Sequence, residues 1–275
     1  MLIDFHLHPS YSIDSGAPVE NIIEAALDKN LQAICFTTHI DLNPKRDCLD
    51  NYIRCGGKLR RCCEETVEAY IEDVRASAER YSGRIEVLIG FELSYGTYFE
   101  NRARDFISEN KPDFVLGAIH CIDNIGITAR DEAPGYFRSV GVGEAARAFV
   151  DATGKLAESG IFATIAHIDG IKKYGRAFYG ESLDRELERL FPPVFTRMAE
   201  LGIGIELNTA SLRKGHPDIY PSKRLLELAG EAGVTVNSVG SDAHKPEEVG
   251  FRLEEAYRLL DETGIAIGEP LARYI

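Results

Sequence analysis

The histidines are the candidate functional residues of this sequence because of their positions. Six of the seven lie at or just after the ends of short apolar runs: His6, His8, His39, His120, His167 and His244. Glu92 and Asp242 occupy matching positions after two further runs. Neutral imidazole and carboxylate together form the ligand set that proteins offer to divalent transition metals. The pattern therefore predicts a metal site.

Two short spacings support this interpretation. Residues two apart in an extended strand project from the same side, so His6 and His8 can reach one ion. Asp242 and His244 repeat that spacing near the other end of the chain. A single histidine at a strand end is more often a hydrogen-bonded structural residue. Six imidazoles buried together without metal, however, would be strongly destabilising.

Several aspartates accompany these motifs. Asp14 lies six residues after His8 and suits a metal ligand or a helix N-cap or turn residue equally well. The aspartates that flank the motifs are expected to orient histidines as hydrogen-bond acceptors and not to bind metal themselves. They are Asp4, Asp41, Asp123 and Asp169.

Short β-branched apolar runs alternate along the chain with amphipathic stretches. The runs are typical of buried parallel strands and lie at 2–5, 33–37, 85–91, 113–119, 161–166, 203–207 and 235–239. The amphipathic stretches predict helices at 19–28, 64–81, 144–158, 183–199, 222–232 and 246–260.

Seven strand–helix repeats favour a closed or nearly closed α/β barrel, with a doubly wound open sheet as the alternative. In such barrels the active site is assembled at the C-terminal ends of the strands, where the histidines stand. We expect one domain over residues 1–275, with long loops at 43–61 and 124–143.

Composition limits the classes of function. The 275 residues carry a formal charge of −13, which disfavours unspecific binding to nucleic acid. No apolar run approaches the roughly twenty residues of a membrane span, and the start of the sequence does not resemble a signal peptide. The six cysteines are expected to be free thiols of a cytoplasmic protein. Roles for Cys48, Cys55, Cys62 and Cys63 remain open.

The motifs HLH, TTH, FE, IHC, AHID and GSDAH together resemble the polymerase and histidinol phosphatase (PHP) superfamily, and the resemblance covers nearly the whole chain. The stretches AHIDGIKKYG, IELNTASLRKGHPDIYPS and GSDAHKPEEVG resemble its histidinol-phosphatase branch. This resemblance implies a distorted (β/α)7 barrel with a trinuclear metal centre at the C-terminal ends of the strands.

The resemblance also implies which residues hold each ion. The first ion would be held by His6, His8, Glu92 and Asp242, the second by Glu92, His120 and His167, and the third by Asp14, His39 and His244. Many superfamily members have histidine where this chain has Asp14, and an oxygen ligand there can change the metal preference. Zinc, iron and manganese are the typical metals of the superfamily.

The implied activity is hydrolysis of a phosphate monoester, namely L-histidinol phosphate in histidine biosynthesis. A hydroxide bridging two ions would attack phosphorus, and the cations would neutralise the developing charge. Asp242 or His244 could assist the leaving group beside Glu92. Arg213 and Arg176 resemble the phosphate-contacting arginines of that branch, and Tyr11 is a candidate for packing on an imidazole substrate. Further phosphate-binding candidates are Lys172, Lys173, Lys214 and His216.

Three alternatives stay open at this point. The first is a phosphoesterase of the same superfamily with another small substrate, such as a nucleotide or a sugar phosphate, because barrel loops set specificity. The second is a metal-dependent amidohydrolase, and the third is a metal-binding module without catalytic activity.

Overall fold

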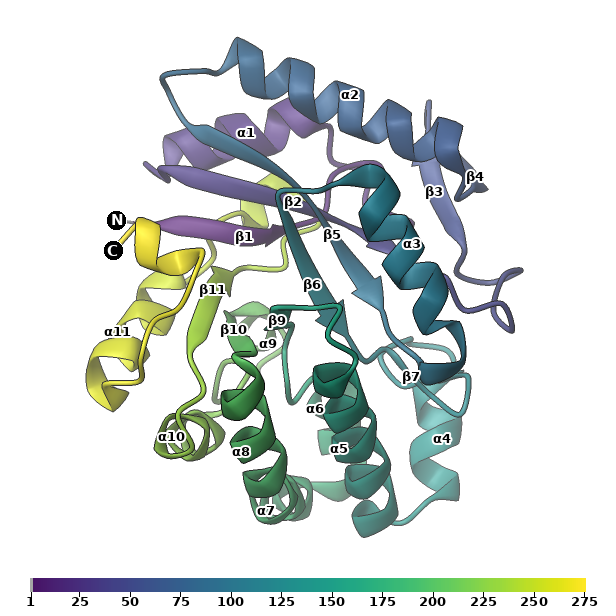
Figure 1. Cartoon of the computed structure of the whole chain (residues 1–275), viewed down its shortest axis with the longest axis vertical. Coiled ribbons are helices and arrows are strands. Elements are labelled where there is room, and N and C mark those ends of the chain that lie inside the picture. Colours follow the sequence, from purple (N-terminus) through teal and green to yellow (C-terminus); the bar gives the residue numbers. More distant parts are fainter. Residues whose placement is uncertain (1) are drawn as a thin grey trace.

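A curved sheet of seven parallel strands lies at the centre of the computed structural model, which describes residues 2–275 (Figure 1). In spatial order the strands are β1 (Ile3–Leu7), β2 (Ala33–Ile40), β5 (Glu86–Ser94), β6 (Phe114–Ala118), β9 (Thr164–Ile165), β10 (Gly204–Asn208) and β11 (Val236–Gly240). All seven predicted strands are present. The fifth is much shorter than predicted, since only two of its residues keep regular ladder pairing.

The first and last strands come together at their C-terminal ends. Leu7 forms a parallel bridge with Ala243, and the backbone N–H of His8 donates to the Ala243 carbonyl at 2.8 Å. The sheet is therefore a nearly closed seven-stranded barrel, which confirms the barrel prediction over the open doubly wound sheet. Tyr274 packs its ring 5.4 Å from that of Phe5, so the C-terminal segment lies beside β1 (Figure 1).

Helices surround the barrel (Figure 1). The α-helices are α1 (Val19–Asp28), α2 (Glu64–Arg80), α3 (Glu100–Asn110), α4 (Ala133–Ser139), α5 (Val142–Glu158), α6 (Lys172–Tyr179), α7 (Glu181–Leu190), α8 (Pro192–Leu201), α9 (Ala210–Arg213), α10 (Lys223–Glu231) and α11 (Leu253–Thr263). Single 3₁₀ turns lie at η1 (Thr97–Phe99), η2 (Pro246–Glu248) and η3 (Leu271–Arg273).

Helix α1 shows why these stretches fold as they do. Its buried residues Val19, Ile22, Ile23 and Ala26 follow the helical spacing and cover the barrel. The predicted helix at 183–199 is instead two helices, because Pro192 begins a new helix and cannot donate into the preceding turn.

The predicted helix at 246–260 is also wrong in its first half. A 3₁₀ turn at Pro246–Glu248 is followed by two residues with left-handed backbone, Gly250 and Arg252, and α11 begins only at Leu253. Left-handed φ angles are incompatible with a continuing right-handed helix. Helices α3, α4, α6 and α9 have no counterpart in the sequence prediction.

Both predicted long loops contain regular structure. Within 43–61, β3 (Tyr52–Cys55) and β4 (Lys58–Arg61) form a hairpin whose turn, Gly56–Gly57, has positive φ at both residues. The loop at 124–143 contains helix α4 and β8 (Ile125–Gly126), which pairs with β7 (Cys121–Ile122).

Arg46 fastens these two loops to each other. It is 3% exposed, and its guanidinium nitrogens Nη1 and Nη2 lie 2.8 and 2.7 Å from the Glu132 carboxylate. Nη1 also donates to the Asn124 carbonyl at 2.7 Å, and Nε bonds to Asp50. The loops therefore form one wall over the C-terminal end of the barrel.

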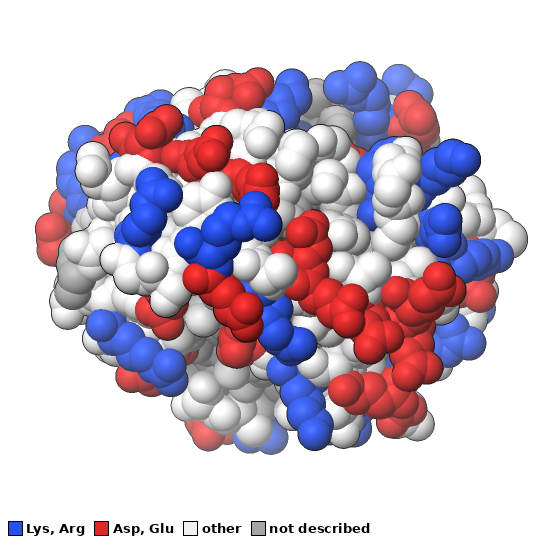
Figure 2. Space-filling view, turned by 90° about the horizontal axis from the view of Figure 1, so that it is seen from above, with Lys and Arg blue, Asp and Glu red and all other residues white. Residues whose placement is uncertain are grey.

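Charge on the surface is mixed, with a band of acidic side chains across the face shown in Figure 2. All six cysteines are free thiols, as expected. Among the described residues, no helix combines the length and the apolar character that crossing a membrane requires.

Candidate metal centre

Glu92 lies at the centre of the histidine cluster at the C-terminal end of the barrel. It is 1% exposed and ends in two oxygens that face different imidazoles. Its Oε1 lies 2.7 Å from His167 Nε2 and 3.1 Å from His120 Nε2. Its Oε2 lies 2.7 Å from His39 Nδ1 and 3.4 Å from His6 Nε2. One carboxylate thus faces histidines from four other strands or strand ends.

Strand register explains part of this convergence. His39 on β2 and Glu92 on β5 are directly paired neighbours in the parallel ladder. His6 and His8 alternate with Phe5 and Leu7 on β1, so both imidazoles project into the barrel end while the apolar side chains enter the core. The sequence spacing had placed His6 and His8 on the same side of the strand, and the structure does the same.

Asp242 follows β11 at a sharp reversal of the chain, with a φ of 55°. Its Oδ1 lies 3.1 Å from His8 Nε2 and 3.8 Å from His6 Nε2. The residues His6, His8 and Asp242 therefore offer three donor atoms within 4.8 Å of one another.

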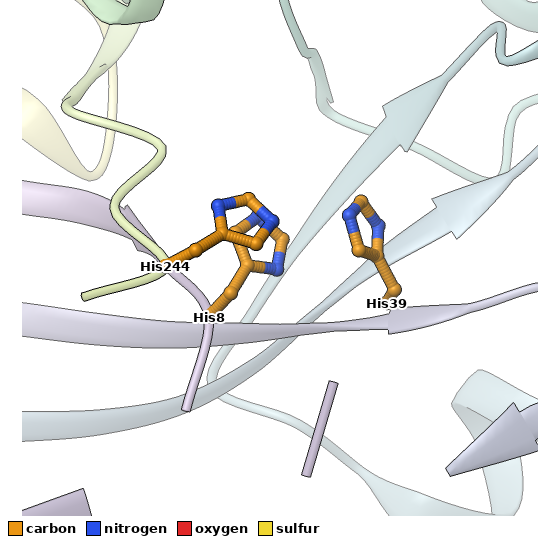
Figure 3. Close-up of side chains that lie close together, drawn as sticks. All are labelled: His8, His39 and His244. Carbon is orange, nitrogen blue, oxygen red and sulfur yellow. The ribbon is translucent and has the colours of Figure 1, made fainter. Parts of the chain in front are cut away.

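Asp14, His39 and His244 lie at the solvent-facing rim of the cluster. Asp14 Oδ2 is 3.1 Å from His244 Nε2 and 3.7 Å from His39 Nε2. The His8 ring stacks against both other imidazoles, with its centroid 4.2 Å from that of His39 and 4.2 Å from that of His244, and those two centroids are 5.8 Å apart (Figure 3). Asp14 is not a helix N-cap, since α1 begins only at Val19. The structure thus brings together all nine residues predicted as metal ligands.

Three buried donor atoms in the cluster, His6 Nε2, His8 Nε2 and Glu92 Oε2, form no hydrogen bond of good geometry, although His39 Nδ1 lies 2.7 Å from Glu92 Oε2 and Asp242 Oδ1 lies 3.1 Å from His8 Nε2. Buried polar atoms are almost always paired in folded proteins, and each unpaired one costs about 1–3 kcal/mol. A divalent cation accepts electron pairs from imidazole nitrogen and carboxylate oxygen. The donor set present here fits such an ion.

The ionisation of the two carboxyl groups favours the same interpretation. Burial alone would raise the pKa of Glu92, but the nearby imidazoles, foremost His39 and His120, hold that pKa well below its usual range. Burial also opposes ionisation of Asp242, and His6 and His8 outweigh it, so the pKa of Asp242 is lowered as well. Both carboxyl groups are therefore ionised and able to bind a cation.

His8 is held neutral. Burial, followed by repulsion from His39 and His244, places the pKa of His8 well below its usual value. A neutral imidazole offers a lone pair at Nε2, which is the state that metal binding requires.

Glu206 orients His6 and was missed by the sequence prediction. It is fully buried on β10, and its Oε1 lies 2.6 Å from His6 Nδ1. Its Oε2 accepts from the backbone N–H of His167 at 3.0 Å. A carboxylate inside an apolar run, as in IELN, is the signal that could have found it, because a buried charge needs a partner.

Serine hydroxyls hold two further rings. His8 Nδ1 lies 3.1 Å from Ser12 Oγ, and His120 Nδ1 lies 2.8 Å from Ser94 Oγ. These contacts fix ring orientation in the way outer partners of metal-binding histidines do.

Two of the aspartates predicted for this orienting role, Asp4 and Asp169, have other partners. Asp4 accepts from the backbone N–H groups of Ser241 and Gly250, each at 2.8 Å, and so anchors the chain after β11. Asp169 pairs with Lys172 at 2.8 Å. Of the remaining two, Asp123 lies in the β7–β8 turn with positive φ, and Asp41 lines the cavity described next.

A cavity of about 470 Å³ opens above the cluster. Its walls differ in charge. Asp41 and Asp50 lie on the side of the fastened loops, where Arg46 pairs with Asp50. Lys173, Arg213 and Lys214 lie on the wall formed after β9 and β10, and Glu248 lies 3.9 Å from Arg213. Glu92, His120 and Asp242 are among the residues at its base.

Of the three predicted substrate-binding residues, only Arg213 lines this cavity. Its Nη1 and Nη2 donate to the carbonyls of Ser241 at 2.5 Å and Asp242 at 2.7 Å, so it also supports the turn that presents Asp242. Arg176 lies outside the cavity lining and binds Asp184, with Nη1 at 3.2 and 3.0 Å from the two carboxylate oxygens.

Tyr11 lies away from this cavity. Its hydroxyl donates to the Ala69 carbonyl at 3.3 Å, and its ring packs edge-on against Tyr70 at 5.4 Å. The side chain thus joins the packing under α2 and does not line the cavity. Lys172, also a candidate, is buried between Asp169 and Asp184, with Nζ 2.8 Å from each.

Comparisons with known proteins agree with this architecture. The PHP domain model matches residues 4–210. A protein from Deinococcus radiodurans named "Probable histidinol-phosphatase" is 29% identical over 269 residues, covering 96% of this chain and 94% of that protein. A protein from Lactococcus lactis subsp. lactis named "Histidinol-phosphatase" is 21% identical over 264 residues, covering 95% and 91%.

Among solved structures, the histidinol phosphate phosphatase of Lactococcus lactis subsp. lactis, in complex with zinc, L-histidinol and phosphate, has a TM-score of 0.78. It is 19% identical and the match covers 96% of this chain and 94% of that one, so the two share a fold. The family model matches most of the chain, and the nearly closed barrel agrees with it. The chain therefore belongs to the PHP domain family.

Proposed function

We propose that this protein hydrolyses L-histidinol phosphate to L-histidinol and phosphate. The observation that carries the proposal is a cluster of six histidines around the buried carboxylate of Glu92, at the base of a cavity with one cationic wall. The names of relatives that match along nearly their whole length support the choice of substrate. Hydrolysis of this ester would serve histidine biosynthesis.

Three divalent ions are proposed as cofactors, with zinc the candidate suggested by the related structure. The proposed ligand sets are His6, His8, Glu92 and Asp242; Glu92, His120 and His167; and Asp14, His39 and His244. Bound there, the ions would supply a hydroxide nucleophile at neutral pH and offset the charge that develops on the phosphoryl oxygens.

The protein's own side chains prepare this site. Glu206 and Ser12 fix the ring planes of His6 and His8, which keeps their Nε2 atoms aimed at the cavity base. Arg213 holds the Asp242 turn through two carbonyls. Because these partners are in place before substrate arrives, little reorganisation is needed in the transition state.

The acidic wall suits the other end of the substrate. L-histidinol phosphate carries an amino group, which is cationic at neutral pH. Asp41 and Asp50 offer carboxylate oxygens within 4.8 Å of each other, and Asp41 forms no ion pair within residues 2–275. Burial and the charge of Asp50 raise the pKa of Asp41. An ammonium group placed there would offset the repulsion between the two carboxylates.

We also propose that residues 1–275 form one domain, because a continuous hydrophobic core includes residues from every strand of the barrel. A cytoplasmic location is proposed on the ground that all six cysteines are free thiols.

The test is release of phosphate by the purified protein loaded with zinc, iron or manganese. L-Histidinol phosphate is compared with a panel of nucleotide and sugar phosphates. We expect its kcat/KM to exceed every other by at least about a hundredfold, equivalent to roughly 2.7 kcal/mol of differential transition-state binding. Equal activity across the panel would keep the phosphoesterase chemistry and reject this substrate.

A further inference from the structure

The loop that carries Asp14 contains no helix or strand. It runs from residue 8 to residue 18, between β1 and α1. Within residues 2–275 the Asp14 carboxylate contacts only the imidazoles of its proposed co-ligands, His39 and His244. No other side chain orients it, so its place at the rim of the cluster depends on how the backbone of this loop is held.

Two serines anchor the loop on its inner side. Ser12 Oγ lies 3.1 Å from His8 Nδ1 and accepts from the backbone N–H of His39 at 3.2 Å. Ser15 Oγ donates to the His244 carbonyl at 2.9 Å. The loop is therefore in contact with three other proposed metal ligands, and a displacement of the loop would disturb all of them.

The β3–β4 hairpin anchors the loop on its outer side, through a single residue. The backbone N–H of Arg54 donates to the Tyr11 carbonyl at 2.8 Å, and its Nη2 donates to the Ile13 carbonyl at 3.0 Å. These two carbonyls lie on either side of Ser12, and the second immediately precedes Asp14. Arg54 thus holds the stretch of backbone that leads into the proposed ligand.

The hairpin is itself fixed and can hold the loop in place. Ile53 is fully buried in the hydrophobic core, and Cys55 Sγ donates to the Thr66 carbonyl on α2 at 3.7 Å (Figure 1). The guanidinium of Arg54 forms no ion pair within the described part of the chain, and its other bond goes to the Gly57 carbonyl at 3.4 Å. A cationic donor bonds a carbonyl more strongly than a neutral donor does.

We infer that Arg54 is a positioning residue of the metal centre, which acts on Asp14 by holding the backbone on either side of Ser12. The inference rests on the proposed function for the third ion, which Asp14 would bind with His39 and His244. Asp14 is 53% exposed, so in a loose loop its carboxylate would turn into water. A loop that is ordered before the ion arrives costs less entropy on binding, and this raises the affinity.

The first experiment measures amide hydrogen exchange of the full zinc-loaded chain by mass spectrometry. Arg54→Met keeps the stem of the side chain and the bond to Tyr11, and it removes the bond to Ile13. We expect amides of the loop at 8–18 to exchange about tenfold faster, at an unchanged midpoint of thermal unfolding. Arg60→Met is the matched control, because Arg60 is exposed on β4 of the same hairpin.

The second experiment is a zinc titration against a competing chelator. In Arg54→Met we expect one ion per chain to bind about tenfold more weakly, with the other ions unchanged. Arg54→Lys should restore part of the affinity, because an ammonium group can still donate to one carbonyl. In the Asp14→Asn background Arg54→Met should have no further effect, since Arg54 acts through Asp14.

Wild-type exchange and wild-type zinc affinity in Arg54→Met would overturn the inference. An equal additional loss of affinity in the Asp14→Asn background would overturn it as well, because Arg54 would then act on another part of the protein. Activity towards L-histidinol phosphate enters neither measurement. A protein that holds its third ion with the help of Arg54 but does not hydrolyse this ester would retain the inference and reject only the proposed substrate.

Discussion

Two groups among the predicted metal ligands differ in their access to water. The buried group consists of His6, His8 and Glu92, of which the histidines are fully buried and Glu92 is 1% exposed. The rim group consists of Asp14, which is 53% exposed, and His39 and His244, which are each 23% exposed. Water can replace a ligand lost from the rim, whereas a ligand lost from the buried group leaves a desolvated cation site incomplete. The two groups should therefore respond differently to substitution, to chelators and to pH.

Substitution of Glu92 should have the largest effect. Glu92→Gln removes the charge that faces five imidazoles and that two proposed ions share. We expect kcat/KM to fall by at least about 10³-fold, beyond the 10–100-fold typical of outer partners, with loss of bound metal. Phosphate release and elemental analysis measure the two quantities. Wild-type turnover with full metal content would show that the buried group does not hold the catalytic ions.

Substitution of Glu206 tests whether metal binding by the buried group depends on the orientation of the His6 ring. Glu206→Gln keeps the shape but removes the carboxylate that bonds His6 Nδ1 at 2.6 Å. We expect zinc affinity or kcat/KM to fall by about 10–100-fold. Zinc titration with a competing chelator measures the affinity. The exposed Glu254 on α11 provides the surface control as Glu254→Gln, and an equal loss in both variants would contradict a specific role for Glu206.

Asp14 tests the rim group in the same way. In Asp14→Asn we expect loss of one ion per chain and a fall in kcat/KM of about tenfold, because solvent can fill the vacated position. Stepwise removal of metal from the wild type by a chelator should likewise release one ion first. Simultaneous loss of all ions from the variant would show that rim and buried group form one indivisible site.

The pH dependence of metal affinity should be the smallest effect and should arise from His39 in the rim group. Burial alone would lower the pKa of His39, but Glu92 and Asp14 outweigh it and raise that pKa to about 9. Below pH 9 the metal-free protein carries a proton on His39 that an ion must displace, so metal affinity should rise with pH and level off near 9. The expected slope is up to about tenfold per pH unit, measured as zinc affinity between pH 7 and 10. A flat profile would contradict it.

Part of the site could be predicted because it follows regular spacing. The alternation of β1 places His6 and His8 on one side, and the ends of parallel strands meet at one edge of the barrel. Glu206 escaped prediction because it sits inside an apolar run, and only the fold brings it next to His6, 200 residues away. Asp4 and Asp169 have other partners than the histidines, because sequence proximity to a histidine does not determine where a carboxylate points.

Fold details that depend on backbone exceptions were also missed. The left-handed residues Gly250 and Arg252 interrupt an amphipathic pattern that reads as one helix. The Tyr11 ring follows the first motif in sequence, but packing against Tyr70 takes it away from the cavity. Hydrophobic periodicity records which residues are buried, and it does not record which neighbour they meet.

The buried guanidinium of Arg46 links two loops that belong to different crossovers of the barrel. Neither loop is an independent module: one contributes the cation, and the other contributes the carboxylate of Glu132 and the carbonyl of Asn124. Transplanting either loop alone into a related barrel would strand a charge without its partner. Evolution of specificity on this wall is therefore constrained to coordinated change, with both loops inherited or redesigned as a pair.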